Sequence, residues 1–254
     1  MGEIIAVASG KGGVGKTVAV TGLGQALAKK DKKVLLIDVD FGLRNLDISL
    51  GVENEVVFDV LDCIDGRCSI NDAIIRIQGF DDKLMFLPAS QSRGGKYIDE
   101  NKFREFFLGL KDEFDYIIAD CPAGLGLELV ASCVDKAIIV VLPYISAIRD
   151  ADRCIDMFEK NNVAECKLLI NAMRCDLVEK KVMWNADDIM DLLGIEIIGI
   201  VPYDEELLKV GKADRTSFAY TAFDNISSRI LGESVPIMNI RKKRKSLLSI
   251  LKKN

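Results

Sequence analysis

Near the start of the chain lies the sequence Gly10-Lys11-Gly12-Gly13-Val14-Gly15-Lys16-Thr17, which fits the pattern G-x-x-x-x-G-K-[ST]. An apolar run, Ile4 to Ala8, precedes it, and a segment with helical spacing follows it. A glycine-rich turn between a strand and a helix directs its backbone N–H groups and the positive end of the helix toward phosphates. The stretch therefore predicts a nucleotide site in which Lys16 reaches the β- and γ-phosphates and the Thr17 hydroxyl binds Mg²⁺. The residues expected to contact the nucleotide here are Gly10, Lys11, Gly12, Gly13, Val14, Gly15, Lys16, Thr17 and Val18.

Short apolar runs recur along the chain and predict the strands of a sheet. They cover Ile4 to Ala8, Val34 to Asp38, Leu84 to Leu87, Tyr116 to Asp120, Ala137 to Leu142, Lys167 to Ile170 and Ile195 to Val201. Because the runs are continuous rather than alternating, we expect strands covered on both faces and a mostly parallel, doubly wound sheet flanked by helices. The chain of 254 residues shows no internal linker, so we expect one α/β domain with a P-loop NTPase fold.

Helical spacing separates these runs, and proline marks where several of them end. The predicted helices are Thr17 to Lys30, Phe58 to Asp62, Asn71 to Arg76, Asn101 to Phe114, Leu127 to Val134, Arg149 to Asn161, Asp187 to Leu193, Glu205 to Val210 and Ala219 to Leu231. Four prolines follow strand-like runs directly; they are Pro88, Pro122, Pro143 and Pro202. Ligands of doubly wound sheets bind at the carboxyl ends of the strands, so chemistry is expected beside these prolines.

Acidic side chains end two of the predicted strands. Asp120 closes an apolar strand, an arrangement that presents a carboxylate to Mg²⁺ beside a phosphate loop. Asp38 and Asp40 end the strand that begins at Val34, and alternation places them on the same side of an extended chain. We assign Asp40 to catalysis, and Asp38 and Asp120, with Thr17, to the metal. The chain has no histidine, so hydrolysis would depend on carboxylates, lysines and metal.

The composition indicates a reduced, cytoplasmic protein. Its seven cysteines show no C-x-x-C spacing, which disfavours structural zinc and a disulfide framework. The longest apolar runs, such as Ala137 to Pro143, are too short to span a bilayer, and no secretory segment is expected before the first strand.

The end of the chain is basic and amphipathic. Residues from Arg241 to Asn254 carry seven Lys or Arg and no acid, and removing this +7 from the net charge of −5 leaves −12 on the rest. At helical spacing the apolar residues of the tail cover an arc of about 160° with lysines opposite. The pattern predicts membrane contact through Leu247, Leu248, Ile250, Leu251, Lys252 and Lys253. A solvated basic tail or a nucleic-acid tag is the alternative, which explains the charge but not the apolar arc.

The phosphate loop resembles the deviant loop of the ParA/MinD ATPases, in which an additional lysine, here Lys11, reaches across a dimer interface to the partner's nucleotide. Further blocks resemble the division-site branch of this family in the same order; they are Asp38 to Asp47, Pro88 to Arg93, Asp120 to Gly124 and Ile148 to Arg153. The resemblance covers nearly the whole chain. It implies ATP and Mg²⁺ as cofactors, Lys11, Lys16 and Asp40 as catalytic residues, and adenine contacts from Asn171, Pro202 and Asp204.

The resemblance also implies a slow, partner-stimulated ATPase that dimerises on binding ATP and takes part in division-site placement. Residues 1–236 would form the ATPase domain and residues 237–254 a membrane-targeting tail. The expected partners are a second copy of the chain, anionic lipids, and division-inhibitor and ATPase-activating proteins of the Min type. The protein would be cytoplasmic, and peripheral on the cytoplasmic face of the cell membrane when ATP is bound. Two departures from the family pattern are Val18, where a hydroxyl residue is common, and Cys121, where serine is common.

Three other functions fit parts of the pattern. A flagellar-number regulator of the FlhG type usually has an extension before the loop, whereas only nine residues precede Gly10, and Arg44 favours the division-site branch. A ParA-like DNA-partitioning ATPase would need basic residues over the folded body, so nucleic acid is not an expected partner. An iron–sulfur carrier of the same superfamily would need paired cysteines, which the sequence does not show.

Overall fold

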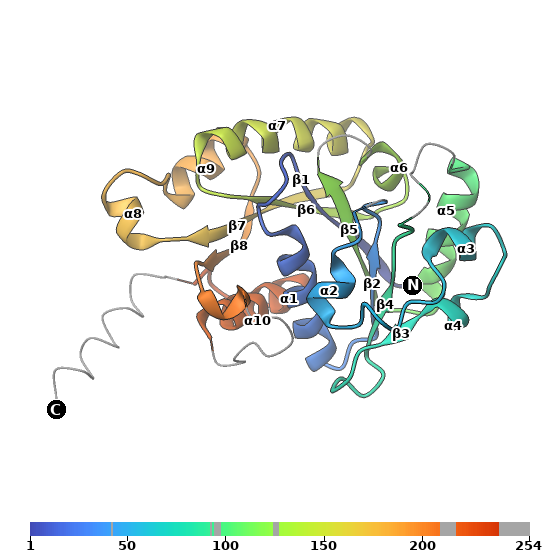
Figure 1. The fold of residues 1–254 in the computed structure, drawn as a ribbon. Helices are drawn as coiled ribbons and strands as arrows, with labels where there is room; N and C mark the ends of the chain where they lie inside the picture. The colour runs from blue at the N-terminus through green and yellow to red at the C-terminus, as the bar shows by residue number, and fades with distance from the viewer. Residues whose placement is uncertain (42, 92, 94–97, 124–126, 209–216, 239–254) are drawn as a thin grey trace, which may run out of the picture.

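The sheet at the centre of the fold contains eight strands (Figure 1). The computed structural model describes residues 1–41, 43–91, 93, 98–123, 127–208 and 217–238. The strands lie in the order β3-β4-β2-β5-β1-β6-β7-β8, and every pair is parallel except β3 with β4. Their bounds are β1 Glu3–Ser9, β2 Val34–Asp38, β3 Ile75–Arg76, β4 Leu84–Leu87, β5 Tyr116–Ala123, β6 Lys136–Val141, β7 Glu165–Met173 and β8 Ile197–Pro202. The predicted single α/β domain with a mostly parallel sheet is therefore confirmed.

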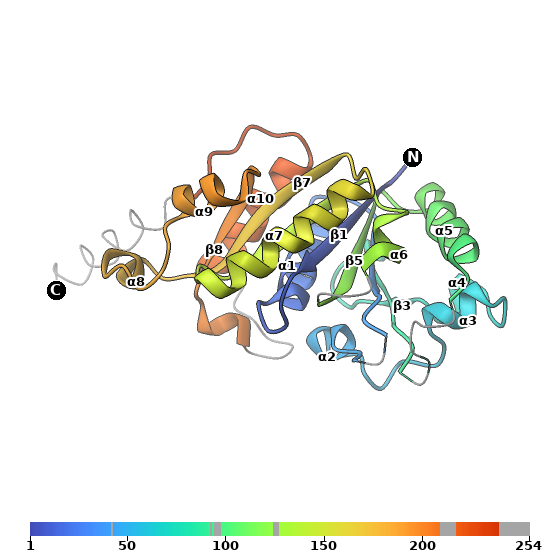
Figure 2. The ribbon, with the colours of Figure 1, turned by 90° about the horizontal axis from the view of Figure 1, so that it is seen from above.

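Helices cover both faces of the sheet, as the continuous apolar strands predict (Figures 1 and 2). Side chains of β1 alternate between two cores, with Ile4 and Ala6 in one and Ile5 and Val7 in the other. The first core is completed by α3 Val60–Ile64, α5 Glu100–Gly109, α6 Leu127–Ala131, α7 Ile145–Lys160 and α9 Ala186–Leu193. The second is completed by α1 Lys16–Lys29, α2 Leu46–Leu50 and α10 Phe218–Ile230. Burial of each strand on both sides is what requires the runs to be apolar throughout.

Several predicted helices end elsewhere in the structure. The helix predicted from Asn71 to Arg76 is wrong in its second half, because α4 Ile70–Ala73 ends there and Ile75 pairs with Phe86 of β4 in an antiparallel ladder. The β-branched Ile75 is buried in that position, which favours a strand. The α5 helix stops at Gly109 and continues as the 3₁₀-helix η2 Leu110–Asp112, while α7 begins four residues before Arg149. Two short helices were not predicted, α2 and α8 Cys175–Glu179. The helix predicted to start at Glu205 is the 3₁₀-helix η3 Glu205–Leu208 where it is described.

Arg229 of α10 ties the end of the described chain to the sheet. Its guanidinium donates three hydrogen bonds of 2.7 Å, from Nη1 to the carbonyl of Ile198 in β8, from Nε to Val235 and from Nη2 to Pro236. Burial lowers the pKa of this group. None of the helices in the described ranges has the length and apolarity that crossing a bilayer requires.

Candidate nucleotide site

The glycine-rich loop joins the carboxyl end of β1 to the first turn of α1. Gly13 and Gly15 have φ angles of 77° and 92°, in the left-handed region that glycine tolerates and other residues rarely adopt. Gly15 is the N-cap of α1, so the loop delivers free backbone N–H groups directly to the start of the helix. The local geometry is the one that the sequence pattern predicts for a phosphate cradle.

Two elements, α7 and β7, pack closely against the glycine-rich loop. A Cβ placed on Gly10 would lie 1.8 Å from the backbone oxygen of Asp150, so the loop packs directly on α7. Asn171 at the end of β7 donates from Nδ2 to the carbonyl of Val14 at 2.8 Å, and a Cβ on Gly15 would lie 2.2 Å from the same nitrogen. Asn171 therefore holds the loop, a role that the sequence reasoning missed, and its adenine contact stays a prediction. The sequence also did not predict that the backbone of Asp150 contacts Gly10, although Asp150 belongs to a block that resembles the family, Ile148 to Arg153.

The two loop lysines differ in environment. Lys16 is buried, with 8% of its surface exposed, whereas Lys11 is exposed. The positive charge of Lys16 lowers the pKa of both Asp40 and Asp120. The structure thus gives the loop one buried and one exposed lysine, and their roles at the nucleotide stay predictions.

Asp120 and Thr17 form the most direct polar contact of the site. The Thr17 hydroxyl donates to Asp120 Oδ2 at 2.7 Å, and Asp120 is 3% exposed. Burial raises the pKa of Asp120 to about 7, and repulsion from Asp38 adds to the rise, while the bond from Thr17 lowers it. The other oxygen, Oδ1, is buried and has no hydrogen-bond partner within the described part of the chain. A buried carboxylate oxygen left free beside a hydroxyl is a donor set that suits a hard cation such as Mg²⁺.

Asp38 is the last residue of β2 and Asp40 follows the strand, and the two carboxyl groups have different surroundings. The Asp38 carboxylate is buried and accepts hydrogen bonds from the backbone nitrogens of Asp40 at 2.9 Å and of Asn45 and Leu46 at 3.3 Å each. Burial raises its pKa to about 6, against the effect of these bonds. Asp38 therefore organises the loop after β2. Asp40 is half-buried; burial raises its pKa, and the charge of Lys16 lowers it.

Magnesium commonly takes only one or two carboxylates from a protein and completes its shell with phosphate oxygens and water. No group of three or more acidic or cysteine side chains arranged for a metal occurs among the described residues. Thr17 and Asp120 nonetheless fit Mg²⁺ through the free Oδ1 atom, and they would hold it beside the loop. Asp38 stays a predicted ligand whose oxygens already accept backbone hydrogen bonds.

The remaining predicted site residues lie around this centre or outside the described ranges. Pro202 is buried at the end of β8, and Asp204 accepts from the backbone nitrogens of Glu206 at 3.1 Å and Ala219 at 3.3 Å. Val18 is half-buried against the second core. Cys121 is fully buried in the first core and its thiol donates to the carbonyl of Ala119. The residues predicted to contact a membrane, Leu247, Leu248, Ile250, Leu251, Lys252 and Lys253, lie outside the described residues.

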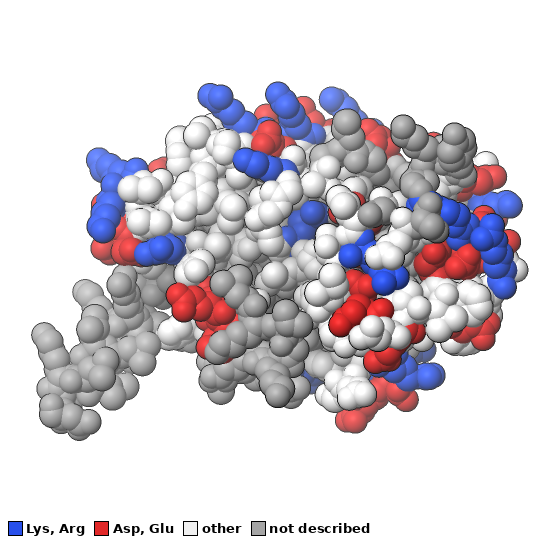
Figure 3. Space-filling view, viewed as in Figure 1, with Lys and Arg blue, Asp and Glu red and all other residues white. Residues whose placement is uncertain are grey.

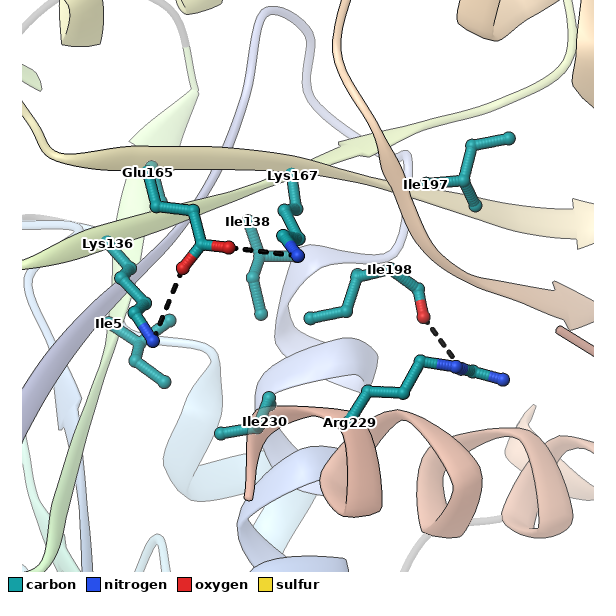
Figure 4. A pocket seen from close by; sticks show the side chains of 10 residues that line it. Ile5, Lys136, Ile138, Glu165, Lys167, Ile197, Ile198, Arg229 and Ile230 are labelled. Atoms are coloured by element: carbon teal, nitrogen blue, oxygen red, sulfur yellow. Dashed lines mark hydrogen bonds and ion pairs between the residues drawn. The ribbon is translucent and has the colours of Figure 1, made fainter. Parts of the chain in front are cut away.

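A separate cavity of about 90 Å³ lies at the opposite edge of the sheet, near the amino ends of β6 and β7 (Figure 4). Isoleucines from three strands and α10 line it, and Glu165 sits between Lys136 and Lys167 at its rim, at 3.3 Å and 2.9 Å. Lys136 also pairs with Glu3 and Lys167 with Glu196, and the guanidinium of Arg229 beside the cavity donates to backbone carbonyls. The cavity is not part of the nucleotide site.

A glycine loop, a buried lysine and a Thr–Asp pair at the carboxyl edge of a mostly parallel sheet define a P-loop nucleotide-binding protein. Residues 5–217 match the family described as the CobQ/CobB/MinD/ParA nucleotide binding domain, and the chain belongs to this family. The resemblance to the ParA/MinD ATPases that the sequence indicates is thereby confirmed.

Individual relatives show which members of the family this chain is similar to. The chain is 40% identical over 261 residues to the septum site-determining protein MinD of Bacillus subtilis (strain 168), covering 99% of this chain and 97% of the relative. It is 38% identical over 249 residues to MinD of Thermotoga maritima, covering 94% and 92%. Among solved structures, a chain of the MinC:MinD cell division protein complex of Aquifex aeolicus superposes with a TM-score of 0.87, at 39% identity, over 93% of this chain and 98% of that one. MinD of Pyrococcus horikoshii complexed with Mg-ADP superposes with a TM-score of 0.79, at 26% identity, over 92% and 100%.

Proposed function

We propose that this protein is a MinD-like ATPase that dimerises on binding ATP, associates reversibly with the inner membrane surface and takes part in division-site placement. The observation that carries the proposal is the Thr17–Asp120 hydrogen bond of 2.7 Å at the mouth of a glycine loop that contains two lysines. Relatives with identities near 40% over almost the whole chain are septum site-determining proteins, which supports the same role here.

In this site each side chain has a distinct task. The Lys16 ammonium binds the β- and γ-phosphates, and the loop N–H groups from Gly12 to Lys16 hold the remaining phosphate oxygens. Bound Mg²⁺, held by Thr17 and Asp120, would neutralise charge on the phosphates. Asp40 orients the attacking water, and its pKa, raised by burial, is consistent with a carboxylate poised to share a proton. Slow hydrolysis then times the release of the dimer.

Exposed apolar side chains near the same edge of the sheet support dimerisation. Leu43 is 66% exposed and Ile48 is 50% exposed after β2, and Tyr144 and Ile145 are 38% and 44% exposed after β6. These loops flank the phosphate loop, on which Lys11 is exposed. A second copy facing this edge would cover the apolar residues and receive Lys11 at its own phosphates. Burial of such surface is the main favourable term in association.

Replacing Lys11 tests the dimer. For Lys11→Ala we expect retained ATP binding and loss of the ATP-dependent dimer, measured by light scattering after size exclusion with a non-hydrolysable analogue. Lys11→Arg, which keeps the charge, should restore part of the dimer. A Lys11→Ala protein that still dimerises with ATP would contradict the proposal.

Membrane association is proposed from the sequence of the tail and from mass action. One short amphipathic segment binds an anionic surface weakly, because ordering it opposes the burial of a few aliphatic side chains. Two tails carried by one dimer bind with an avidity roughly 10² to 10⁴ times higher. We therefore propose residues 1–236 as the ATPase domain and residues 237–254 as the targeting tail, with ATP controlling the protein's place between cytoplasm and membrane.

Co-sedimentation with anionic liposomes tests the tail. ATP or its non-hydrolysable analogue should bring the protein to the liposomes, and ADP should not. The double variant Leu247→Glu and Leu251→Glu should abolish this binding. The matched control is Ser246→Glu with Ser249→Glu, which adds the same charge off the apolar arc and should retain most of the binding. Equal losses in the two variants would mean that charge alone holds the tail.

The proposed protein partners are a division inhibitor and an ATPase-activating protein of the Min type. A MinD relative has been solved in a complex named MinC:MinD, which supports the first of them. Among the described residues on the viewed face, Figure 3 shows acidic and basic side chains intermixed, without a continuous basic surface for nucleic acid. ATP-dependent binding of a Min-type inhibitor, with no salt-sensitive binding to random duplex DNA, is the expected result.

A further inference from the structure

Two thiols face each other in the turn between α3 and α4. Cys63 lies in the last turn of α3, Cys68 lies two residues before α4, and their Sγ atoms are 3.5 Å apart. Both side chains are partly exposed. A disulfide needs an Sγ–Sγ separation of about 2.05 Å, so the two atoms would have to approach by about 1.5 Å. This pair belongs to no part of the nucleotide site.

The backbone of the turn fixes this approach. Gly66 adopts a left-handed conformation with a φ of 70°. Its nitrogen donates to the carbonyl of Cys63 at 3.0 Å, and the nitrogen of Arg67 donates to the carbonyl of Asp62 at 2.9 Å. These two bonds close the helix end in the manner of a Schellman motif and turn the chain back on itself. Cys68 is thereby returned to the side of Cys63 by ordered structure rather than by chance contact.

The surroundings of the turn are held by ion pairs. Asp59 and Asp62 both accept from Arg93, at 3.3 Å and 2.8 Å, and Asp62 also pairs with Arg67 at 3.4 Å. Asp62 and its neighbour Asp59 form a capping box at the start of α3. These ion pairs tie the start of α3 to the end of the turn, on either side of Cys63.

Burial makes both thiols weakly acidic. Burial raises the pKa of Cys63 to about 12, and burial also raises the pKa of Cys68, although the hydrogen bond from Cys63 opposes this at Cys68. Asp59, Asp62 and Asp72 raise the pKa of Cys68 further. Both shifts disfavour the thiolate, so oxidation of the pair should become faster as the pH rises. Acidic surroundings favour an uncharged oxidant over an anionic one such as glutathione disulfide.

We propose that Cys63 and Cys68 are a redox modification site, at which a hydroperoxide converts the two thiols into an intramolecular disulfide. The thiolate of one cysteine attacks a peroxide oxygen and becomes a sulfenic acid, the O–O bond breaks, and the leaving oxygen takes up the proton that the thiol released and departs as water or alcohol. The sulfur of the other cysteine then attacks the sulfenic sulfur, the S–O bond breaks and water leaves with the second thiol proton. The two sulfurs together lose two electrons, which the peroxide accepts.

Peptide mapping of the full-length protein tests this directly. Treatment with a small excess of hydrogen peroxide should lower the intact mass by that of two hydrogen atoms, measured before alkylation blocks the remaining thiols. Trypsin cleaves after Arg67, so the disulfide would join the peptide Asn45 to Arg67 to the peptide Cys68 to Arg76. We expect this linked pair, its loss on reduction with dithiothreitol, and alkylation of both cysteines reduced by at least about tenfold.

Single variants give the controls. Cys63→Ser and Cys68→Ser should each abolish the linked peptides, whereas Cys175→Ser, on α8 at the far end of the fold (Figure 1), should leave them unchanged. Two results would overturn the proposal: no linked pair in folded protein after oxidation, or conversion of Cys68 to sulfinic acid with Cys63 still free. Neither depends on nucleotide turnover, so the outcome is separate from that of the proposed function.

Discussion

Asp38 and Asp120 occupy directly paired positions on the neighbouring strands β2 and β5, and both carboxyl groups are almost fully buried. Burial raises their pKa values to about 6 and about 7, and at Asp120 repulsion from Asp38 adds to the rise. Two carboxylates held close together away from water repel each other. Protonation of one of them, or binding of a cation between them, relieves this repulsion. The pairing thus prepares the carboxyl edge for magnesium before any nucleotide binds.

The raised pKa values predict that the nucleotide-free protein loses stability as the pH rises. Between the ordinary value of 3.8 and about 7, the folded state keeps protons that the unfolded state has released, so the free energy of unfolding falls across this window. Asp120→Asn should remove much of the fall and raise stability by about 2 kcal/mol near pH 8. Urea unfolding over a pH series measures this, with the exposed Asp152→Asn as control. A wild-type profile that rises from acid to neutral pH would contradict the assignment.

Thr17→Ala should lower ATP hydrolysis by at least about a hundredfold, because it removes the hydroxyl predicted to bind Mg²⁺. The change also removes the hydrogen bond to Asp120. Thr17→Ser keeps a hydroxyl and should retain activity within about tenfold. The rate should be measured against magnesium concentration, since loss of a metal ligand shifts that dependence whereas general damage to the fold does not. Equal activity in the Ala and Ser variants would argue against a metal role for this hydroxyl.

Gly10→Ala should destabilise the protein by about 1 to 3 kcal/mol, since overpacking against backbone has few ways to relax. The added Cβ would lie 1.8 Å from the backbone oxygen of Asp150. Gly12→Ala is the matched control, because a Cβ there meets nothing within 4 Å. Thermal unfolding of the two nucleotide-free variants makes the comparison. If both unfold at the same temperature, the loop does not pack on α7 as the structure describes.

Asn171→Ala should cost about 1 kcal/mol of stability through loss of its hydrogen bond to the Val14 carbonyl. Asn171→Asp removes the donor while keeping the size, and should weaken nucleotide binding further because it adds a negative charge beside the phosphates. Binding of a fluorescent ATP analogue measures both effects. A variant that loses affinity for ATP but not for other nucleoside triphosphates would instead indicate the predicted adenine contact.

Patterns of local origin were predictable from the sequence. The glycine loop, the strand-end acids Asp38 and Asp120, and most strands follow from spacing and continuous apolarity, because each depends on neighbours along the chain. Contacts between segments that lie far apart in the sequence could not be predicted in this way. Asn171 meets Val14 across 157 positions of sequence, and Ile75 pairs with Phe86 of β4, which turns the second half of a predicted helix into β3. The thiol pair was missed because five-residue spacing carries no familiar signal, and only the left-handed Gly66 brings the sulfurs together.

The three hydrogen bonds of Arg229 connect the end of the described chain to the sheet, so a force applied to that end is transmitted to the sheet. Tension applied beyond Pro236 passes through the guanidinium to the Ile198 carbonyl, and so into the sheet rather than along α10 alone. The bonds to Val235 and Pro236 share that load. Pulling on the carboxyl end would therefore strain β8, which lies beside the strand carrying Asn171.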